Sequence, residues 1–341
     1  MKVLITGTAG FIGFHLAQKL CKNGIQVVGL DNINNYYDVS LKYARLAESG
    51  IESKEIDYNK IVTSQKFKSY RFIKLNLEDK ENLDSLFRAE NFDIVCNLAA
   101  QAGVRYSIEN PFAYVQSNIV GFLNILECCR HNKIKHLIYA SSSSVYGNSK
   151  KVPFTEEDNV NQPVSLYAAT KISNELMAYT YSHLYNFRTT GLRFFTVYGP
   201  WGRPDMAPMI FTKKITEGKP IDVFNNGELY RDFTFIDDII EGVEKIISFR
   251  YSEEKSKIYN IGNSQPILLM DFINHLEFVI GKKARLNMLP MQDGDVYKTY
   301  ADSRNFFFDT GIKPKIQLKE GISEFYNWYI SFHKNPKSKV S

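Results

Sequence analysis

A short apolar run that leads into a glycine-rich turn constrains the fold of this 341-residue chain more than any other feature. Residues 2–6 (KVLIT) have the composition of a buried strand, and an amphipathic pattern over residues 11–23 predicts a helix. Glycines let the backbone approach a pyrophosphate, and a helix N-terminus offers free N–H groups, so this unit predicts a nucleotide phosphate site. Its candidate cofactor contacts are Gly7, Gly10, Phe11, Ile12 and Gly13.

The next strand-like run suggests which nucleotide is bound. Residues 26–30 are apolar and end at Asp31, eighteen residues after Gly13. A carboxylate at this place can accept both ribose hydroxyls of an adenosine and repels a 2′-phosphate. The neutral residues Asn32 and Asn34 that follow offer no cation to such a phosphate. We therefore expect NAD rather than NADP, with Asp31 and Asn32 as cofactor contacts; an Asp that only caps a turn is the alternative.

Strand-like and helical segments alternate through the first 195 residues and predict an α/β protein with a doubly wound, Rossmann-type parallel sheet. Further strands are expected at 70–75, 92–98, 135–141 and 189–193, with helices at 40–48, 81–89, 111–130 and 165–185. The region from 34 to 69 is otherwise irregular and polar, and we assign no chemistry to it. The composition changes after residue 195: the sequence becomes rich in glycine, proline and aromatic residues, which predicts a loop at 196–204.

This change of composition predicts two domains. We expect residues 1–180 to form an NAD-binding domain, with later segments at about 233–262 returning to it. Residues 181–333 are expected to form mainly a smaller mixed α/β substrate domain, with helices at 208–217 and 237–248 and strands at 221–224 and 257–261. The polar stretch 334–341 lacks periodicity and is expected to be a disordered tail.

Tyr167 and Lys171 are the candidate catalytic pair. Residues four apart lie on one face of a helix, so the phenol and the ammonium are expected to point the same way. A cation beside a phenol lowers its pKa and turns it into a base for an alcohol proton. The spacing alone is weak, because Tyr70/Lys74 and Tyr251/Lys255 share it. The glycine loop and the serines at the end of the 135–141 strand, Ser142 and Ser143, raise the significance of the Tyr167 match, although serines there also suit a turn.

Composition narrows the class of protein. The formal charge of +5 is mild, and no run of Lys and Arg is dense enough to indicate a nucleic-acid partner. Apolar runs are too short for a membrane span, and we expect no signal peptide, because residues 1–2 lead directly into a strand-like run. The four cysteines show neither a disulfide framework nor zinc-like spacing, so no metal is expected. We expect buried free thiols in a cytoplasmic protein.

Together these residues resemble the extended short-chain dehydrogenase/reductase family over essentially the whole chain. Within it the sequence is most similar to nucleotide-sugar 4-epimerases, and among those to UDP-glucuronate 4-epimerases. The stretches that carry the second resemblance are LDN at 30–32, YYDV at 36–39, AQAGVRYS at 100–107, GPWGRPDMA at 199–207 and RDFTFIDD at 231–238. The resemblance implies an isomerase that keeps NAD tightly bound and acts on a UDP-sugar.

The resemblance also implies roles for single residues. Tyr167 would remove the proton of the sugar 4-OH while the hydride from C4 passes to NAD and later returns to the other face. Lys171 would bind the nicotinamide ribose and lower the tyrosine pKa, and Ser142, or Ser143, would hydrogen-bond the same sugar oxygen. The remaining cofactor contacts would be Asn76, Leu77, Leu98, Ala99, Ala100 and Gln101. The remaining substrate contacts would be Arg105, Thr196, Arg203, Arg231 and Asp295.

Specificity for glucuronate rests on Arg203 and Thr196, which in similar enzymes hold the sugar carboxylate. A planar guanidinium suits bidentate binding of a carboxylate. Oxidation at C4 makes a β-keto acid, and a clamp on the carboxylate limits the geometry that loses CO2. Two residues depart from the family pattern: Asn76 replaces an Asp at the adenine, and Asp293 replaces a Pro near the phosphates. The alternative to carboxylate binding is that Arg203 only orders its own loop, which is rich in glycine and proline.

Other functions remain open from the sequence. A UDP-glucose or UDP-N-acetylglucosamine 4-epimerase is the main alternative. A decarboxylase or dehydratase is disfavoured, because relatives with those activities carry acids where this chain has Ser143 and Ser144. A non-catalytic NAD-binding scaffold is a third possibility, although the Tyr–Lys pair is kept. The resemblance implies a homodimer through the helices at 111–130 and 165–185, and surface-polysaccharide synthesis as the use of the product.

Overall fold

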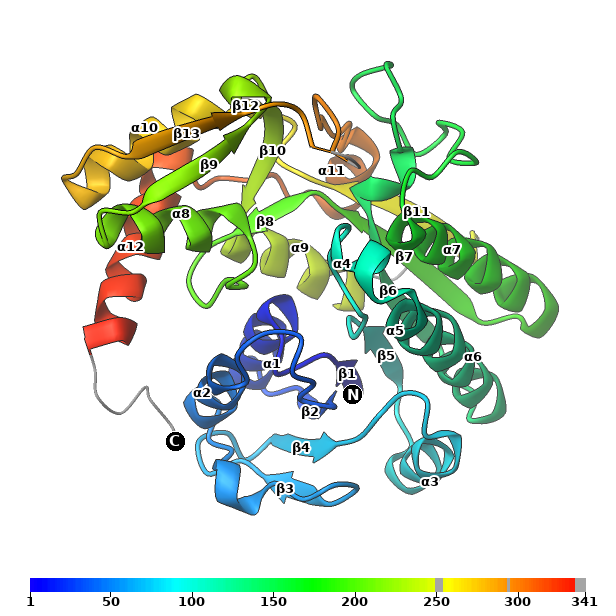
Figure 1. Ribbon diagram of the computed structural model, residues 1–341. Helices are drawn as coiled ribbons and strands as arrows, with labels where there is room; N and C mark the ends of the chain where they lie inside the picture. The colour runs from blue at the N-terminus through cyan, green and yellow to red at the C-terminus, as the bar shows by residue number, and fades with distance from the viewer. Residues whose placement is uncertain (249–253, 293–294, 335–341) are drawn as a thin grey trace.

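An eight-stranded sheet forms the centre of the protein in the computed structural model, which describes residues 1–248, 254–292 and 295–334 (Figure 1). The strand order is β11-β7-β6-β5-β1-β2-β4-β3, and all neighbours are parallel except β3 with β4. The predicted doubly wound parallel sheet is confirmed. Its strands are β1 (Lys2–Thr6), β2 (Gln26–Asp31), β3 (Ile61–Thr63), β4 (Tyr70–Lys74), β5 (Ile94–Asn97), β6 (His136–Ser142), β7 (Arg188–Phe194) and β11 (Ser256–Ile261).

Helices cover both faces of this sheet, and each face has its own apolar core. One core includes side chains from α1 (Phe11–Lys22), α2 (Ser40–Glu48), α9 (Ile236–Ser248) and α11 (Arg304–Thr310). The other includes side chains from α3 (Lys80–Glu90), α6 (Gly121–His131) and α7 (Leu166–Tyr185). Between β5 and α6 lie α4 (Tyr106–Glu109), α5 (Pro111–Tyr114) and a π-helical turn η2 (Val115–Val120).

The order of the strands fixes where a ligand can bind. The chain moves outward from β1 to β2 and β4 and then returns to β5 on the other side of β1. Loops that leave β1 and β5 therefore diverge, and a crevice opens at the carboxyl ends of the strands where the direction changes. The glycine loop after β1 lies at this crevice.

A smaller part of the molecule faces the same edge of the large sheet (Figure 1). It holds a three-stranded sheet of β8 (Thr196–Tyr198), β10 (Tyr230–Phe235) and β12 (Pro266–Leu268), and a two-stranded sheet of β9 (Pro220–Phe224) and β13 (Arg285–Leu289). Its helices are α8 (Ala207–Thr216), α10 (Leu269–Ile280) and α12 (Leu318–Lys334). The α1-side core runs without a break from β1 into α10, so the two parts pack intimately.

Several expectations need correction. The region 34–69 contains β3 as well as the predicted helix, and the predicted loop at 196–204 begins with β8. Short strands of this kind lack the length for a recognisable alternation. The expected tail is wrong at Lys334, which ends α12, and its other residues lie outside the described part of the chain. The domain limits stay a prediction, although β11 does return to the large sheet.

Two findings concern composition. The prediction of buried free thiols is confirmed for all four cysteines: Cys21, Cys96, Cys128 and Cys129. Across the described residues, no helix combines the length and the apolar composition needed to cross a bilayer.

Candidate active site

A cavity of about 440 Å³ lies between the carboxyl edge of the large sheet and the smaller part of the molecule. It lies at the crevice that the strand order predicts. The predicted site residues that line it are Gly7, Gly10, Phe11, Ile12, Gly13, Asp31, Asn32, Leu77, Leu98, Ala99, Ala100, Gln101, Ser142, Ser143, Tyr167, Lys171, Thr196, Arg203, Arg231 and Asp295. The fold therefore gathers most of the candidate residues around one cavity.

The glycine loop has the shape of a phosphate cradle. Gly7 has a φ of +78°, and its N–H donates to the carbonyl of Leu30 at 2.6 Å. A Cβ on Gly13 would lie 2.2 Å from the Gly7 carbonyl oxygen, so no larger residue fits there. Helix α1 starts after Gly10 without a side-chain cap. Its first N–H groups are thus left for an anionic ligand, and the residues present fit a dinucleotide pyrophosphate.

Asp31 stands at the end of β2 and lines the cavity with its carboxylate fixed by the backbone. One oxygen accepts from the N–H of Ala9 at 3.1 Å, and the other accepts from the N–H of Ile33 at 2.8 Å. Each oxygen keeps a lone pair that can accept from a ribose hydroxyl. The carboxylate is therefore oriented before any ligand binds.

Sequence reasoning missed a cation beside this carboxylate. Lys42 of α2 lines the cavity and is buried, and its ammonium donates to the backbone and side-chain oxygens of Asn34, both at 2.7 Å. Burial lowers the pKa of Lys42, and the charge of Asp31 opposes that shift. Tyr36 and Tyr37 also line the cavity, so the expectation of no chemistry at 34–69 is wrong for its first nine residues. The YYDV run was the available signal.

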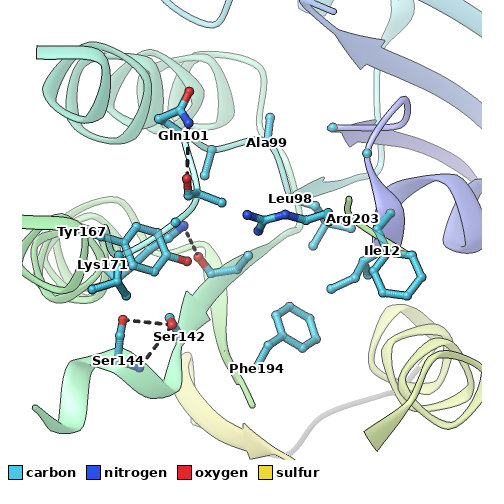
Figure 2. Close-up of a pocket in the computed structure, with 18 of the residues that line it drawn as sticks. Ile12, Leu98, Ala99, Gln101, Ser142, Ser144, Tyr167, Lys171, Phe194 and Arg203 are labelled. Carbon is cyan, nitrogen blue, oxygen red and sulfur yellow. Dashed lines mark hydrogen bonds between the residues drawn. The ribbon is translucent and has the colours of Figure 1, made fainter. Parts of the chain in front are cut away.

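Tyr167 and Lys171 both face the cavity from the first turns of α7 (Figure 2). Ser165 caps this helix by accepting from the N–H of Ala168 at 3.1 Å. The Lys171 ammonium donates to the carbonyl of Ala140 on β6 at 2.7 Å, and burial lowers its pKa to about 8. The helix spacing thus places both groups at one site, as predicted.

The predicted lowering of the Tyr167 pKa by Lys171 stays a prediction, and two other groups act on this phenol. Burial raises the pKa of Tyr167 in this structure, and the two influences that oppose the rise are a hydrogen bond with Ser142 and the charge of Arg203. The Lys171 ammonium donates to the β6 carbonyl of Ala140 and lies 5.9 Å from the centre of the Tyr167 ring. A second cation that favours the phenolate, Arg203, comes from a loop 36 residues further along the chain than Tyr167.

The serines at the end of β6 form a connected cluster. Ser144 donates from its hydroxyl to Oγ of Ser142 at 2.9 Å, and its N–H also donates to that oxygen at 3.2 Å (Figure 2). These bonds fix the Ser142 side chain beside Tyr167. Ser143 lines the cavity as well. Ser144 was not predicted, since serines in a turn offer no signal that separates a positioning hydroxyl from a solvated one.

Arg203 enters the cavity opposite Tyr167, and its guanidinium points toward the tyrosine hydroxyl (Figure 2). Asp205 accepts from Nε at 3.1 Å and from Nη2 at 2.5 Å. Tyr36 donates its hydroxyl to the same carboxylate at 3.0 Å, and burial raises the Tyr36 pKa to about 12. Burial disfavours the charged form of Arg203, but Asp205 outweighs it and keeps the Arg203 pKa above its usual range.

Two predicted residues lie outside the lining. Asn76 is exposed and is not part of the cavity wall, whereas its neighbour Leu77 is. Arg105 is half exposed, stacks on the ring of Phe224 and pairs with Asp295 at 3.2 Å. It reaches the site only through Asp295, which lines the cavity together with Arg231. The Asp293 departure lies outside the described residues.

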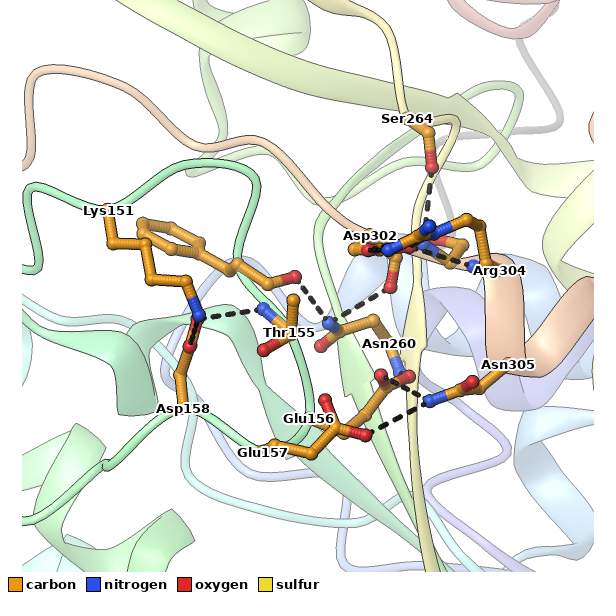
Figure 3. A network of polar contacts seen from close by, with 12 residues as sticks. Lys151, Thr155, Glu156, Glu157, Asp158, Asn260, Ser264, Asp302, Arg304 and Asn305 are labelled. Atoms are coloured by element: carbon orange, nitrogen blue, oxygen red, sulfur yellow. Dashed lines mark hydrogen bonds and ion pairs between the residues drawn. The ribbon is translucent and has the colours of Figure 1, made fainter.

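A polar network supports the cavity wall at Phe154, another lining residue that was not predicted (Figure 3). Asn260 of β11 donates its amide to the carbonyl of Phe154 at 2.9 Å, and its N–H donates to Glu156 at 2.8 Å. Tyr146 donates to the amide oxygen of Asn260 at 2.6 Å and stacks on Phe154 with ring centroids 4.6 Å apart. β11 therefore braces this side of the cavity through buried contacts.

Comparison with known proteins identifies the family. The profile of the NAD dependent epimerase/dehydratase family matches residues 3–262, three quarters of the chain. The chain belongs to this family. Staphylococcus aureus Protein CapI is 51% identical over 98% of this chain and 100% of its own length. A probable UDP-glucuronate 4-epimerase of Rhizobium meliloti is 44% identical, with 100% of each chain covered.

A solved structure of the same family has the same architecture. UDP-glucuronic acid 4-epimerase from Bacillus cereus, in complex with UDP-glucuronic acid and NAD, superposes with a TM-score of 0.85. It is 33% identical and covers 97% of this chain and 99% of its own. The prediction of NAD as cofactor is confirmed by family membership and fits the glycine cradle and Asp31. The chain is an enzyme of the NAD-dependent epimerase/dehydratase family.

Proposed function

We propose that this chain is an NAD-dependent nucleotide-sugar epimerase that inverts C4 of UDP-glucuronate and gives UDP-galacturonate. The observation that carries the proposal is the placement of Arg203 across the cavity from Tyr167 (Figure 2). In glucuronate the carboxylate stands on C5, next to the C4 that reacts. An enzyme for this sugar therefore needs a cation near the residue that acts on the C4 hydroxyl.

The donor set of Arg203 supports this assignment. Asp205 occupies Nε and Nη2, whereas Nη1 takes no part in this ion pair. Thr196 lines the cavity and adds a hydroxyl. A guanidinium can hold a carboxylate in a fixed plane, and this limits the geometry in which a β-keto acid loses CO2. The relatives named for UDP-glucuronate 4-epimerisation add support.

Proton transfer falls to Tyr167. Its hydroxyl would take the proton of the sugar 4-OH, and the Ser142 hydrogen bond and the Arg203 charge both favour the phenolate that must form. NAD, when bound, would supply the acceptor for the C4 hydride and the source of the hydride that goes back to C4. The sugar is then a 4-keto intermediate that rotates in the cavity and presents its other face, after which Tyr167 returns the proton. Ser142 would hold the reacting oxygen throughout.

The phosphate side of the proposal uses Arg231, which lines the cavity. Its Nη1 donates to the carbonyl of Tyr230 at 2.9 Å, so the guanidinium is anchored by its own strand. We assign it to the UDP diphosphate, with Asp295 and Arg105 as the adjoining ion pair. A cytoplasmic location and a use in surface-polysaccharide synthesis stay predictions.

We also propose a homodimer. Helices α5, α6 and α7 lie side by side and expose large apolar side chains, among them Phe112 (79% exposed), Leu176 (64%) and Tyr179 (64%). A surface of this kind on two adjacent helical segments suits a second copy of the chain. Light scattering tests it: the wild-type mass should be twice that of the chain, and Leu176→Glu should halve it.

The experiment that tests the activity is a substrate panel read by NMR at C4 of the product. Purified enzyme should convert UDP-glucuronate to UDP-galacturonate and should act far less on UDP-glucose or UDP-N-acetylglucosamine. Turnover of UDP-glucose without turnover of UDP-glucuronate would contradict the specificity and leave a neutral-sugar epimerase. A UDP-pentose product would show a decarboxylase, and undiminished epimerisation by Tyr167→Phe would remove the proposed base.

A further inference from the structure

Arg45 of α2 is a fully buried cation that joins two loops of the candidate site. Its Nη1 donates to the carbonyl of Ala9 at 2.8 Å and to the hydroxyl of Tyr37 at 2.8 Å. Its Nη2 donates to the carbonyl of Trp201 at 2.7 Å and to that of Gly202 at 3.3 Å, and Nε also reaches Trp201 at 3.2 Å. Every acceptor is a neutral oxygen.

The two loops that meet on Arg45 have different tasks. Ala9 belongs to the glycine loop, and its own N–H holds the carboxylate of Asp31. Trp201 and Gly202 directly precede Arg203, the proposed carboxylate ligand. The segments are about 190 residues apart in sequence, yet one guanidinium contacts the backbone of both. A shift of either loop therefore breaks hydrogen bonds to the other.

The Arg203 loop has two backbone hydrogen bonds of its own, from Gly202 to the Gly199 carbonyl at 3.1 Å and from Met206 to the Arg203 carbonyl at 3.3 Å, and it depends on outside contacts as well. Trp201 adopts a φ of +63°, a left-handed conformation that costs energy for a non-glycine residue. Contacts from the N-terminal half of the chain hold Trp201 in this conformation. His15 of α1 hydrogen-bonds to the Pro200 carbonyl at 2.9 Å, and Arg45 donates to the carbonyls of Trp201 and Gly202. Strain of this kind persists only where the surroundings enforce it.

The chemistry of the side chain explains why arginine stands here. A buried charge without a counter-ion is costly, so an amide or an apolar residue would be preferred if packing alone were needed. The rigid fork of five donors is what reaches two loops at once, and a lysine ammonium on a flexible stem cannot span both. We therefore attribute the presence of arginine here to its hydrogen bonds with both loops and not to the space that its side chain fills.

We propose that Arg45 is a positioning residue that fixes the Arg203 loop against the glycine loop and thereby sets the preference for a carboxylated sugar. This inference rests on the proposed function of Arg203. It predicts that loss of the bridge frees the 199–206 loop and weakens recognition of the sugar carboxylate much more than recognition of the nucleotide.

The first test measures the bridge without any substrate. Hydrogen exchange of the 199–206 peptide in NAD-loaded enzyme should become roughly tenfold faster in Arg45→Met. Arg45→Lys should give an intermediate effect and serves as the second variant if Arg45→Met does not fold by circular dichroism. Arg71→Met is the matched control, because Arg71 pairs with Glu90 away from the cavity. Unchanged exchange in both Arg45 variants would overturn the inference.

The second test measures specificity by calorimetry as the ratio of dissociation constants for UDP-glucose and UDP-glucuronate. Arg45→Met should reduce this ratio by roughly tenfold to a hundredfold, with little change for UDP alone. The same substitution in an Arg203→Met background should leave the ratio unchanged, since Arg45 acts through Arg203. An equal loss of affinity for all three ligands would show a merely structural role and overturn the inference.

The two proposals fail in distinguishable ways. A wild-type enzyme that binds UDP-glucose as tightly as UDP-glucuronate would count against the proposed function and against the specificity role of Arg45. Faster exchange of the 199–206 loop in Arg45→Met would still support the bridge in that case. A wild-type preference for UDP-glucuronate that Arg45→Met keeps in full would overturn the Arg45 inference alone.

Discussion

The cofactor side and the sugar side of the cavity are built in different ways. The cofactor side is a single strand–turn–helix unit followed by one strand, so the glycine loop and Asp31 come from 30 consecutive residues. The proposed sugar side combines Tyr167, Thr196, Arg203 and Arg231, which come from α7, β8, the loop after β8 and β10. A cofactor site of this kind forms with its own backbone, whereas the sugar site exists only when the segments are held against one another.

Several contacts that hold the Arg203 loop come from residues 15–45, in or next to the cofactor side. His15 of α1 and Arg45 of α2 bond three successive carbonyls of the loop before Arg203. Tyr36 bonds Asp205 on the far end of that loop. If Arg203 binds the sugar as proposed, substrate recognition depends on elements whose periodic sequences indicate only cofactor binding. Substitutions can then be chosen to affect one side or the other.

The largest expected effect is that of Tyr167→Phe, which should remove most of the catalysis and leave the binding of cofactor and substrate almost unchanged. Removing the hydroxyl removes the proposed proton acceptor, and general-base catalysis contributes roughly 10² to 10⁴ in rate, so kcat should fall by about 10³. Binding of NAD and of UDP-glucuronate should change only a few-fold. Rate by NMR, cofactor content by absorbance and substrate affinity by calorimetry check the three parts. Loss of NAD together with activity would show that the sides are not separable.

Arg203→Met should affect the sugar side alone. Loss of the guanidinium leaves a sugar carboxylate without its cation and leaves Asp205 unpaired. Removing one partner of a buried charge pair costs about 2–5 kcal/mol, so kcat/KM for UDP-glucuronate should fall by roughly thirtyfold to a few thousandfold. Affinity for UDP should hardly change. A product shift toward a decarboxylated sugar would further support the role of the clamp, and an equal loss with UDP-glucose would contradict it.

Gly13→Ala should affect the cofactor side. The new Cβ would lie 2.2 Å from the carbonyl oxygen of Gly7, so the phosphate cradle must widen. Overpacking of this size costs about 1–3 kcal/mol, which corresponds to roughly a tenfold to hundredfold weaker hold on NAD. NAD retained after gel filtration measures it. Gly24→Asn is the control, because nothing lies within 4 Å of its Cβ position and Asn tolerates its φ of +76°.

The smallest expected effect concerns the hydrogen bond between His15 and the Pro200 carbonyl, and it depends on pH. Burial lowers the pKa of His15 to about 4 from its usual 6.5. Burial of neutral His15 makes its full contribution to the free energy of unfolding above pH 6.5. This contribution is lost as the pH falls toward 4, because the unfolded chain binds a proton that the folded chain does not. Between pH 7 and pH 5 this amounts to about 2 kcal/mol. His15→Gln keeps a donor for the Pro200 carbonyl without a titratable ring, so it should lose that much less stability on acidification.

Urea denaturation at pH 7 and pH 5 checks this prediction. The exposed helical residue His183 provides the control, as His183→Gln. Parallel losses of stability in wild type and His15→Gln would show that the imidazole does not gain a proton on unfolding in this range.

Local patterns in the sequence determined the features that one segment can form by itself. The glycine turn, Asp31 at its strand end and the Tyr167–Lys171 spacing each follow from the periodicity of a strand or a helix, and the alternation of the two predicts a parallel sheet with a cleft at its carboxyl edge. These expectations hold because backbone hydrogen bonding and side-chain direction are local.

Only the tertiary structure decided which side chains act together across the cleft. It turned Lys171 toward the Ala140 carbonyl, set Arg203 as the cation opposite Tyr167, left Asn76 exposed, and brought in Lys42 and Tyr36. A long side chain can reach several partners from one backbone position, so its partner depends on segments that spacing does not place. Arg45 is the clearest case: its sequence context predicts one turn of a helix, and its hydrogen bonds join two loops about 190 residues apart.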